Sequence, residues 1–182
     1  MHRLVGHAIV SANDCIADAA GKIPAGLHNE YDWLRFQAAL DRTAVTVIGR
    51  LSHDAVPNTR RRRRLIVSRQ SNGLEERADG FWLNPAKRPL QTALEQLVPE
   101  GGEIAVVGGQ AVFDLVGAAG FFAFHLARAR SLQLPGGRGL FRACEDGVPA
   151  AEILSNGGLI EGREEMLDPA ADVTLTVWSR PA

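Results

Sequence analysis

The chain has 182 residues and a mass of 19.6 kDa, which is enough for one well-buried domain and too little for two ordinary ones. Hydrophobic residues make up 46% and charged residues 23%, which excludes a disordered or fibrous chain. Because 20 lysines and arginines stand against 21 acidic residues, a generally basic surface for nucleic acid is not expected. We therefore predict a single domain over residues 1–182.

The first half of the chain predicts strands that alternate with helices. The apolar run 4–10 indicates a buried strand, and residues 11–29 form a long loop rich in polar residues, glycine and proline. Apolar residues at helical spacing predict a helix over 30–42. Further strands are expected at 44–48, 65–67 and 81–83, and further helices at 51–56 and 89–98.

The second half continues this alternation and ends differently. We expect a strand at 103–107, a helix at 110–117, a strand at 121–127, a glycine-rich turn at 134–140 and a hairpin of strands at about 158–165 and 172–179. Strands that alternate with helices and end in an antiparallel pair predict an α/β sheet of mixed direction.

No run of about 20 apolar residues is present, and the first residues lack a secretory core, so we expect a cytoplasmic protein with no membrane partner. Cys15 and Cys144 do not form a Cys-x-x-Cys motif, and the five histidines are scattered. Neither a disulfide framework nor a metal site is expected from this pattern.

Two junctions between a strand and a helix contain glycine. Gly108 and Gly109 follow one apolar strand, and Gly49 follows another. Such a junction exposes backbone N–H groups at the positive end of a helix, which suits a phosphate, although a tight turn alone explains it too. The motif is not Gly-x-Gly-x-x-Gly, which disfavours an ordinary Rossmann dehydrogenase.

An acid and an aromatic residue share one face of the helix expected at 30–42. Asp32 and Phe36 are four residues apart, with Arg35 beside them. This pattern is common for solvent-facing charge near a helix start. Alternatively, the carboxylate accepts paired hydrogen bonds from an amino-substituted ring while the phenyl ring packs against that ring.

Five consecutive arginines, Arg60 to Arg64, precede the strand at 65–67. Such a run is usually a solvated loop or an anionic-ligand patch, and one member can turn inward to hold a carboxylate or phosphate. Arg69, just after the strand, is better placed to meet a second phosphate near the glycine junctions. A ribose phosphate at that place favours NADPH over NADH.

Taken in order, these segments resemble the dihydrofolate reductase superfamily, which includes the reductase domain of bacterial riboflavin biosynthesis. The motifs that carry the resemblance are Ile9–Ala17, Asp32–Phe36, Val47–Ser52, Arg62–Ser68 and Val106–Gln110. The resemblance covers nearly the whole chain. It implies a dihydrofolate reductase-like α/β fold of three layers, with a mixed, mostly parallel central sheet, helices on both faces and an antiparallel C-terminal hairpin.

The resemblance further implies an NADPH-dependent reductase of a pterin or related heterocycle. In it Asp32 is the catalytic residue, and Ile9, Phe36 and Arg62 bind substrate, Arg62 at the place that grips the folate tail. The implied cofactor-binding residues are Ile16, Ala17, Gly49, Arg50, Leu51, Ser52, Ser68, Arg69, Gly108, Gly109, Gln110, Ala111 and Val112.

The departures from the family are concentrated around the substrate. Leu27 stands near the tryptophan of the mobile loop, Ala127 replaces a threonine that orients the catalytic acid, and Asn13-Asp14 replaces Asp-Gly. Two alternatives therefore stay open: 5-amino-6-(5-phosphoribosylamino)uracil reductase activity, as in riboflavin biosynthesis, and a noncatalytic NADP-binding protein. The expected partner is a small heterocyclic substrate, and a homodimer is left open. A nucleic-acid-binding module built on the arginine run is disfavoured, because no aromatic residues interleave it.

Overall fold

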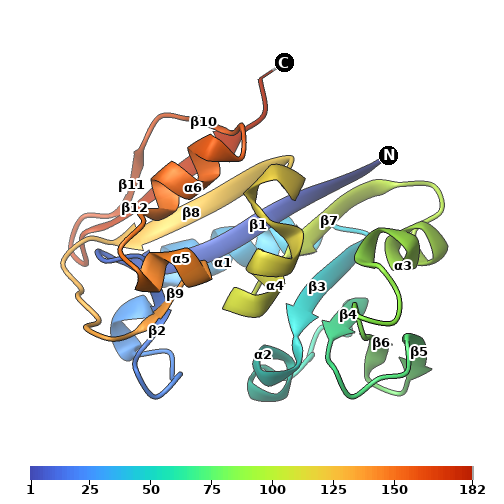
Figure 1. Cartoon of the computed structure of the whole chain (residues 1–182). Coiled ribbons are helices and arrows are strands. Elements are labelled where there is room, and N and C mark those ends of the chain that lie inside the picture. The colour runs from blue at the N-terminus through green and yellow to red at the C-terminus, as the bar shows by residue number, and fades with distance from the viewer. Residues whose placement is uncertain (182) are drawn as a thin grey trace.

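A ten-stranded sheet runs through the computed structural model, which describes residues 1–181 (Figure 1). In spatial order its strands are β10 (Ile160–Glu161), β12 (Val173–Ser179), β8 (Ala123–Ala129), β1 (His2–Ser11), β7 (Gly102–Val106), β3 (Val45–Gly49), β4 (Arg64–Val67), β6 (Gly80–Leu83) and β5 (Leu74–Arg77), while β11 (Glu165–Asp168) also pairs with β12. The strands from β8 to β6 are parallel, and those at both ends are antiparallel. The predicted sheet of mixed direction is confirmed.

Helices cover both faces of this sheet. The apolar core on one face joins β-strand side chains to α3 (Leu90–Leu97), α4 (Gln110–Val116) and α6 (Ala150–Asn156). On the other face, α1 (Glu30–Leu40) packs through Phe36 on His7 of β1. The side chains of His7 and Val10 point to opposite faces because they are three residues apart in a strand.

Four phenylalanines form the centre of the core. Phe124 is fully buried, and its ring centroid lies 5.5 Å from that of Phe113, 5.0 Å from Phe121 and 6.2 Å from Phe141. Gly6 of β1 pairs with Phe124 in the sheet, and a Cβ at Gly6 would overlap the Phe124 ring. The aromatic centre therefore requires a residue without a side chain on the central strand.

The predicted elements are confirmed for most of the sheet, but several short elements were missed. The expected loop 11–29 contains β2 (Cys15–Ala17) and the 3-10 helix Ala25–Leu27, and the expected turn at 134–140 contains β9 (Arg138–Gly139), which pairs with β2. The sequence analysis also missed β5, α5 (Arg142–Glu145), α6 and the 3-10 helix Ala118–Gly120, while α2 (Arg50–Ala55) begins one residue earlier than expected. In the C-terminal hairpin, β12 pairs with both β10 and β11.

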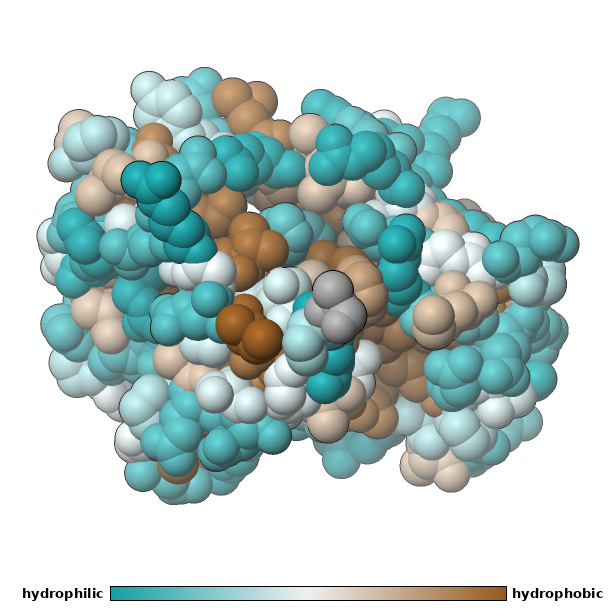
Figure 2. Space-filling model, turned by 90° about the horizontal axis from the view of Figure 1, so that it is seen from above, coloured by the Kyte–Doolittle hydropathy of each residue, from teal (hydrophilic) through white to brown (hydrophobic). Residues whose placement is uncertain are grey.

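Hydrophilic side chains cover most of the surface seen from above in Figure 2, and hydrophobic residues gather in a hollow near its middle. No helix within residues 1–181 has the length and apolar character that crossing a membrane requires. Over the same range, no cluster of three or more histidine, cysteine or acidic side chains is arranged to hold a metal ion.

Candidate functional site

The glycine junctions after β3 and β7 lie side by side at the carboxyl edge of the sheet. The amide of Gly49 donates to the carbonyl oxygen of Gly108 over 2.7 Å, and the amide of Val107 donates to Val47 over 3.0 Å. Because β3 and β7 are parallel neighbours, α2 and α4 begin at the same edge. This edge is where open α/β sheets bind ligands.

The start of α4 is an open cradle of backbone groups. Gly108 has a φ of +94°, and a Cβ there would lie 2.8 Å from the Phe113 ring, so this position requires glycine. Gly109 precedes the helix without a side-chain cap, and a Cβ on it would meet only the Ser52 hydroxyl, at 3.8 Å. Since the first N–H groups of a helix have no partner within it, the space between Gly109 and Ser52 fits a phosphate.

We expect Gly109→Ala to weaken NADPH binding about tenfold or more while changing the free energy of unfolding by only about 0.5 kcal/mol. The added methyl group fills the space in front of the helix start and touches no packed atom. Fluorescence titration with NADPH and thermal unfolding measure the two effects. Gly108→Ala is the contrast, because its methyl group collides with Phe113 and lowers stability. An unchanged NADPH affinity of Gly109→Ala contradicts the assignment of the cradle.

Two arginines and two serines lie around this edge. Arg50 pairs with Asp54, four residues along α2, over 3.0 Å. Arg69 follows β4, is exposed and has no ion pair or side-chain hydrogen bond within residues 1–181. The buried Ser68 hydroxyl accepts from the amide of Gln70 and so shapes the turn that carries Arg69. Arg69 therefore has all its donors available for a ligand.

The other residues predicted to bind cofactor differ in exposure. Ala17 is buried in β2 and Ile16 is half-buried. Leu51 and Ala111 are exposed on α2 and α4. Val112 is buried, and its side chain lies 3.4 Å from the position of a Cβ at Gly49, so its role is to hold the two junctions together.

Asp32 lies in the first turn of α1, where the side chain of Asn29 accepts a hydrogen bond from its amide. Its carboxylate is half-buried and has no hydrogen bond or ion pair within residues 1–181. Burial raises the pKa of Asp32 to about 6, against the opposing effect of Arg35. A carboxyl group in this state gains or loses a proton near neutral pH and has free oxygens for a ligand.

The apolar surroundings of Asp32 come from α1 and β1. The rings of Phe36 and His7 are 5.8 Å apart. The contacts Asn29–Asp168 and Arg35–Glu165 show that α1 runs antiparallel to β11 and so to β1. Asp32, one helical turn before Phe36, therefore lies toward Ile9, two residues beyond His7. Ile9 pairs across the sheet with Ala127, which is fully buried and has no hydroxyl group to offer the carboxylate.

Two solved structures are similar to the whole chain. One, from Shewanella sp. PV-4 and described as a riboflavin biosynthesis protein, has a TM-score of 0.67 and 16% identity over 99% of both chains. The other is a diaminohydroxyphosphoribosylaminopyrimidine deaminase/5-amino-6-(5-phosphoribosylamino)uracil reductase from Thermotoga maritima, with a TM-score of 0.65 and 15% identity. It matches all of this chain, which spans 57% of its length. No protein-family model and no curated protein matches the chain.

The chain has the dihydrofolate reductase-like fold. Within this fold the carboxyl edge of the sheet carries both the glycine cradle and Asp32, which the sequence analysis assigned to cofactor and substrate.

Three aromatic residues that form a cluster with Phe36 were missed by the sequence analysis. Trp33 is half exposed, and its ring lies 5.7 Å from that of Phe36. His7 and His125 stack with ring centroids 4.7 Å apart, and burial lowers the pKa of His7 to about 3 and lowers that of His125. Both imidazoles are therefore neutral at pH 7. The position of His7 was predictable, because it is two residues from Ile9 in one strand and therefore shares a face with it.

Most arginines of the run 60–64 bond to other residues of the chain. Arg62 is mostly buried and donates to Asp41 over 2.6 Å, to the Gln37 side chain over 2.7 Å and to the Gln37 carbonyl over 3.1 Å. Arg60 also pairs with Asp41. Arg63 donates to the carbonyl of Leu97, and Arg64 donates to His53 and to the carbonyl of Val56. The run therefore ties β4 to α1, α2 and α3.

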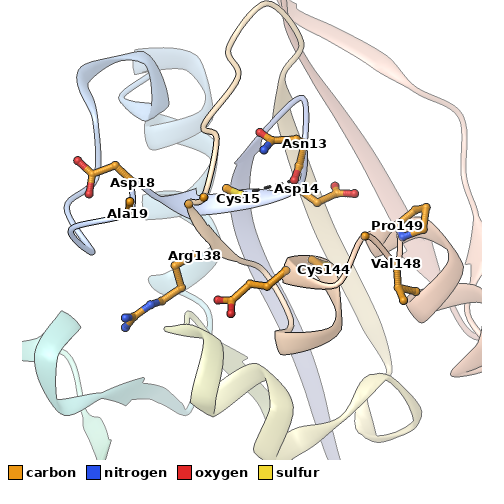
Figure 3. Close-up of a pocket in the computed structure, with 13 residues that line it drawn as sticks. Asn13, Asp14, Cys15, Asp18, Ala19, Arg138, Cys144, Val148 and Pro149 are labelled. Carbon is orange, nitrogen blue, oxygen red and sulfur yellow. Dashed lines mark hydrogen bonds between the residues drawn. The ribbon is translucent and has the colours of Figure 1, made fainter.

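A cavity of about 530 Å³ opens beside β2 and β9 (Figure 3). Cys15 and Cys144 both line it, although they are far apart in sequence. Burial raises the pKa of both thiols, that of Cys144 to about 11. Neither cysteine is therefore an activated nucleophile.

Proposed function

We propose that this chain is an NADPH-dependent reductase of a nitrogen heterocycle that presents an amino-imine edge to Asp32. The observation that carries the proposal is the half-buried Asp32 carboxylate, which has no hydrogen-bond or ion-pair partner within residues 1–181 and a pKa raised to about 6. Carboxyl groups with a pKa raised by burial cluster at functional sites, which supports a ligand at Asp32.

Asp32 binds and orients the substrate. One oxygen accepts a hydrogen bond from the ring amino group, and the proton held at the other oxygen near neutral pH is donated to the imine nitrogen, which makes the ring a better hydride acceptor. Phe36 and Ile9 supply the apolar wall against which the ring packs. Ala127 has no hydroxyl group to orient the carboxylate. Instead, the Asn29 cap, which accepts from the amide of Asp32, fixes the first turn of α1 that carries the carboxylate.

The cradle fits the pyrophosphate of NADPH, because the space in front of Gly109 and Ser52 is open. Gly108, Gly109, Arg50 and Ser52 hold that group, and Arg69 contacts the ribose phosphate. When bound, NADPH supplies the hydride. The chain itself contributes binding, orientation and exclusion of water, the last through residues 11–29.

Among substrates, a pyrimidine ribotide is favoured over dihydrofolate. The donors of Arg62, which the family resemblance assigns to the folate tail, are used by Asp41 and Gln37. In addition, one of the similar structures is a 5-amino-6-(5-phosphoribosylamino)uracil reductase. In this alternative the ribosylamino sugar accepts the hydride instead of the ring, and the sugar phosphate is a further group for the chain to bind.

Arg62→Ala is expected to lower the free energy of unfolding by about 1 to 3 kcal/mol, because the buried Gln37 loses its partners. The same change is expected to leave unchanged the ratio of kcat/KM values for tailed and tail-less pterins. Denaturant unfolding and steady-state kinetics measure the two effects. If the variant keeps its stability and loses affinity for dihydrofolate alone, the prediction is wrong and Arg62 binds the folate tail.

The proposed activity is tested by following NADPH oxidation with dihydrofolate and with the pyrimidine ribotide in parallel. Turnover of either one supports a reductase and identifies its substrate class. Binding of NADPH without turnover of these or related heterocycles, with affinity unchanged in Asp32→Asn, supports the noncatalytic alternative that Ala127 and Leu27 leave open. Failure to bind NADPH at all contradicts the whole proposal.

A further inference from the structure

The short strand β9 is fixed next to the cradle. The side-chain amide of Gln110, the first residue of α4, donates to the carbonyl of Gly139 over 3.0 Å. On its other side β9 pairs with β2, with Arg138 opposite Ala17 and Gly139 opposite Cys15. Arg138 therefore lies between the Ile16–Ala17 segment and the start of α4.

The side chain of Arg138 points away from the packed side of β9. A Cβ at Gly139 would lie 2.8 Å from the Cβ of Cys144, so the face of β9 that contains this position is turned to α5. Because successive residues of a strand point to opposite faces, Arg138 is on the other face. Figure 3 shows its guanidinium extending from β9 away from Cys15 and Cys144, toward the side on which α4 begins.

Arg138 makes no ion pair within residues 1–181, whereas the neighbouring arginines do. It is exposed and makes no ion pair or side-chain hydrogen bond within residues 1–181. By contrast, Arg128 pairs with Asp14 over 2.6 Å, and Arg142 pairs with Glu145 over 3.3 Å. Glu145 accepts a hydrogen bond from Gln110, and the charge of Arg138 helps to lower the pKa of Glu145 without a direct ion pair between them.

The backbone on each side of Arg138 cannot take a side chain. A Cβ at Gly137 would lie 2.6 Å from the carbonyl oxygen of Ala17, and a Cβ at Gly139 would lie 2.6 Å from that of Phe141. These close approaches fix the path of the chain through Arg138. The guanidinium is thus presented from a rigid support, which lowers the entropy that binding costs.

We propose that Arg138 binds a phosphate group that lies next to β9 and the start of α4. The inference rests on the proposed function, which brings two such groups to this edge: the pyrophosphate of NADPH and the phosphate of a ribotide substrate. A guanidinium suits either one, since it donates two parallel hydrogen bonds to phosphate oxygens. The sequence analysis assigned no role to this residue.

The experiment compares wild type, Arg138→Ala, Arg138→Lys and Arg142→Ala. Arg142→Ala removes a neighbouring exposed arginine whose charge is already paired. Fluorescence titration gives the Kd of NADPH. Calorimetric titration gives the Kd of ribose 5-phosphate, which reports on the substrate phosphate. Thermal unfolding of each variant checks that the fold is intact.

We expect Arg138→Ala to raise one of the two dissociation constants about tenfold, Arg138→Lys to recover part of the loss, and Arg142→Ala to match wild type. A loss confined to NADPH assigns the cofactor phosphate, and a loss confined to ribose 5-phosphate assigns the substrate phosphate. Unchanged values for both ligands overturn the inference while leaving the reductase proposal intact. A wild type that binds no NADPH contradicts the reductase proposal instead.

Discussion

Asp32→Asn is expected to lower kcat/KM by a factor of about 10² to 10⁴, the range found for a positioned general acid or base. Asparagine keeps the size of the side chain but has no proton to transfer to the imine nitrogen and cannot accept two hydrogen bonds from the protonated edge. NADPH oxidation against pH measures the effect. Wild-type activity is expected to depend on a group with a pKa near 6, and the variant is expected to lose that dependence. A variant with wild-type kinetics excludes Asp32 from the reaction.

The same variant is expected to be more stable than wild type above pH 6. The pKa of Asp32 is about 6 in the folded chain, against an ordinary value of 3.8. Between these two values the folded chain binds more protons than the unfolded chain, so stability falls as the pH rises through this window. Asparagine avoids that loss, and we expect a gain of about 1 to 3 kcal/mol at pH 8 and none at pH 3.

Asp41→Asn is the matched control for this measurement. The pKa of Asp41 is lowered, chiefly by the hydrogen bond from Arg62, so its contribution to stability is present at neutral pH and lost in acid. Asp41→Asn is therefore expected to destabilise the chain at pH 8. The two substitutions are thus expected to change stability at pH 8 in opposite directions. If both raise or both lower it, the assignment of Asp32 as a desolvated site residue is wrong.

Phe124→Ala is expected to lower the free energy of unfolding by about 3 to 5 kcal/mol, because it leaves a cavity in the middle of the aromatic core. Gly6→Ala is expected to cost about 1 to 3 kcal/mol by overpacking, since the new methyl group overlaps the Phe124 ring. In the double variant the methyl group of residue 6 enters the space that the ring has left. The two costs should therefore not add, and chemical denaturation of all four proteins measures the coupling. Additive costs contradict this packing.

The parallel strands were predictable because their sequences are continuous in apolar character. Strands such as β3 and β7 are buried on both faces, and the glycines at their ends mark where each one stops. The strands β2 and β9 contain only three and two residues, and their pairing joins Cys15 to Gly139. No local sequence pattern predicts this pairing, because the two strands are far apart in the sequence.

The candidate site was predictable to the extent that its residues share one element. Asp32 and Phe36 lie one helical turn apart, so their common face follows from spacing alone. The family resemblance assigned Arg62 to a carboxylate tail, and the sequence did not show that Asp41 and Gln37 use its donors, because they belong to a different element. Arg138 was missed for the same reason, since its position depends on the pairing of β9 with β2.

The central place of β1 also constrains the order in which the chain can fold during synthesis. β1 is made well before both of its neighbours, which are β7, at residues 102–106, and β8, at residues 123–129. Until about residue 130 has left the ribosome, an apolar strand with at least one unpaired edge remains exposed. The nascent chain is thus most prone to aggregation before β8 emerges.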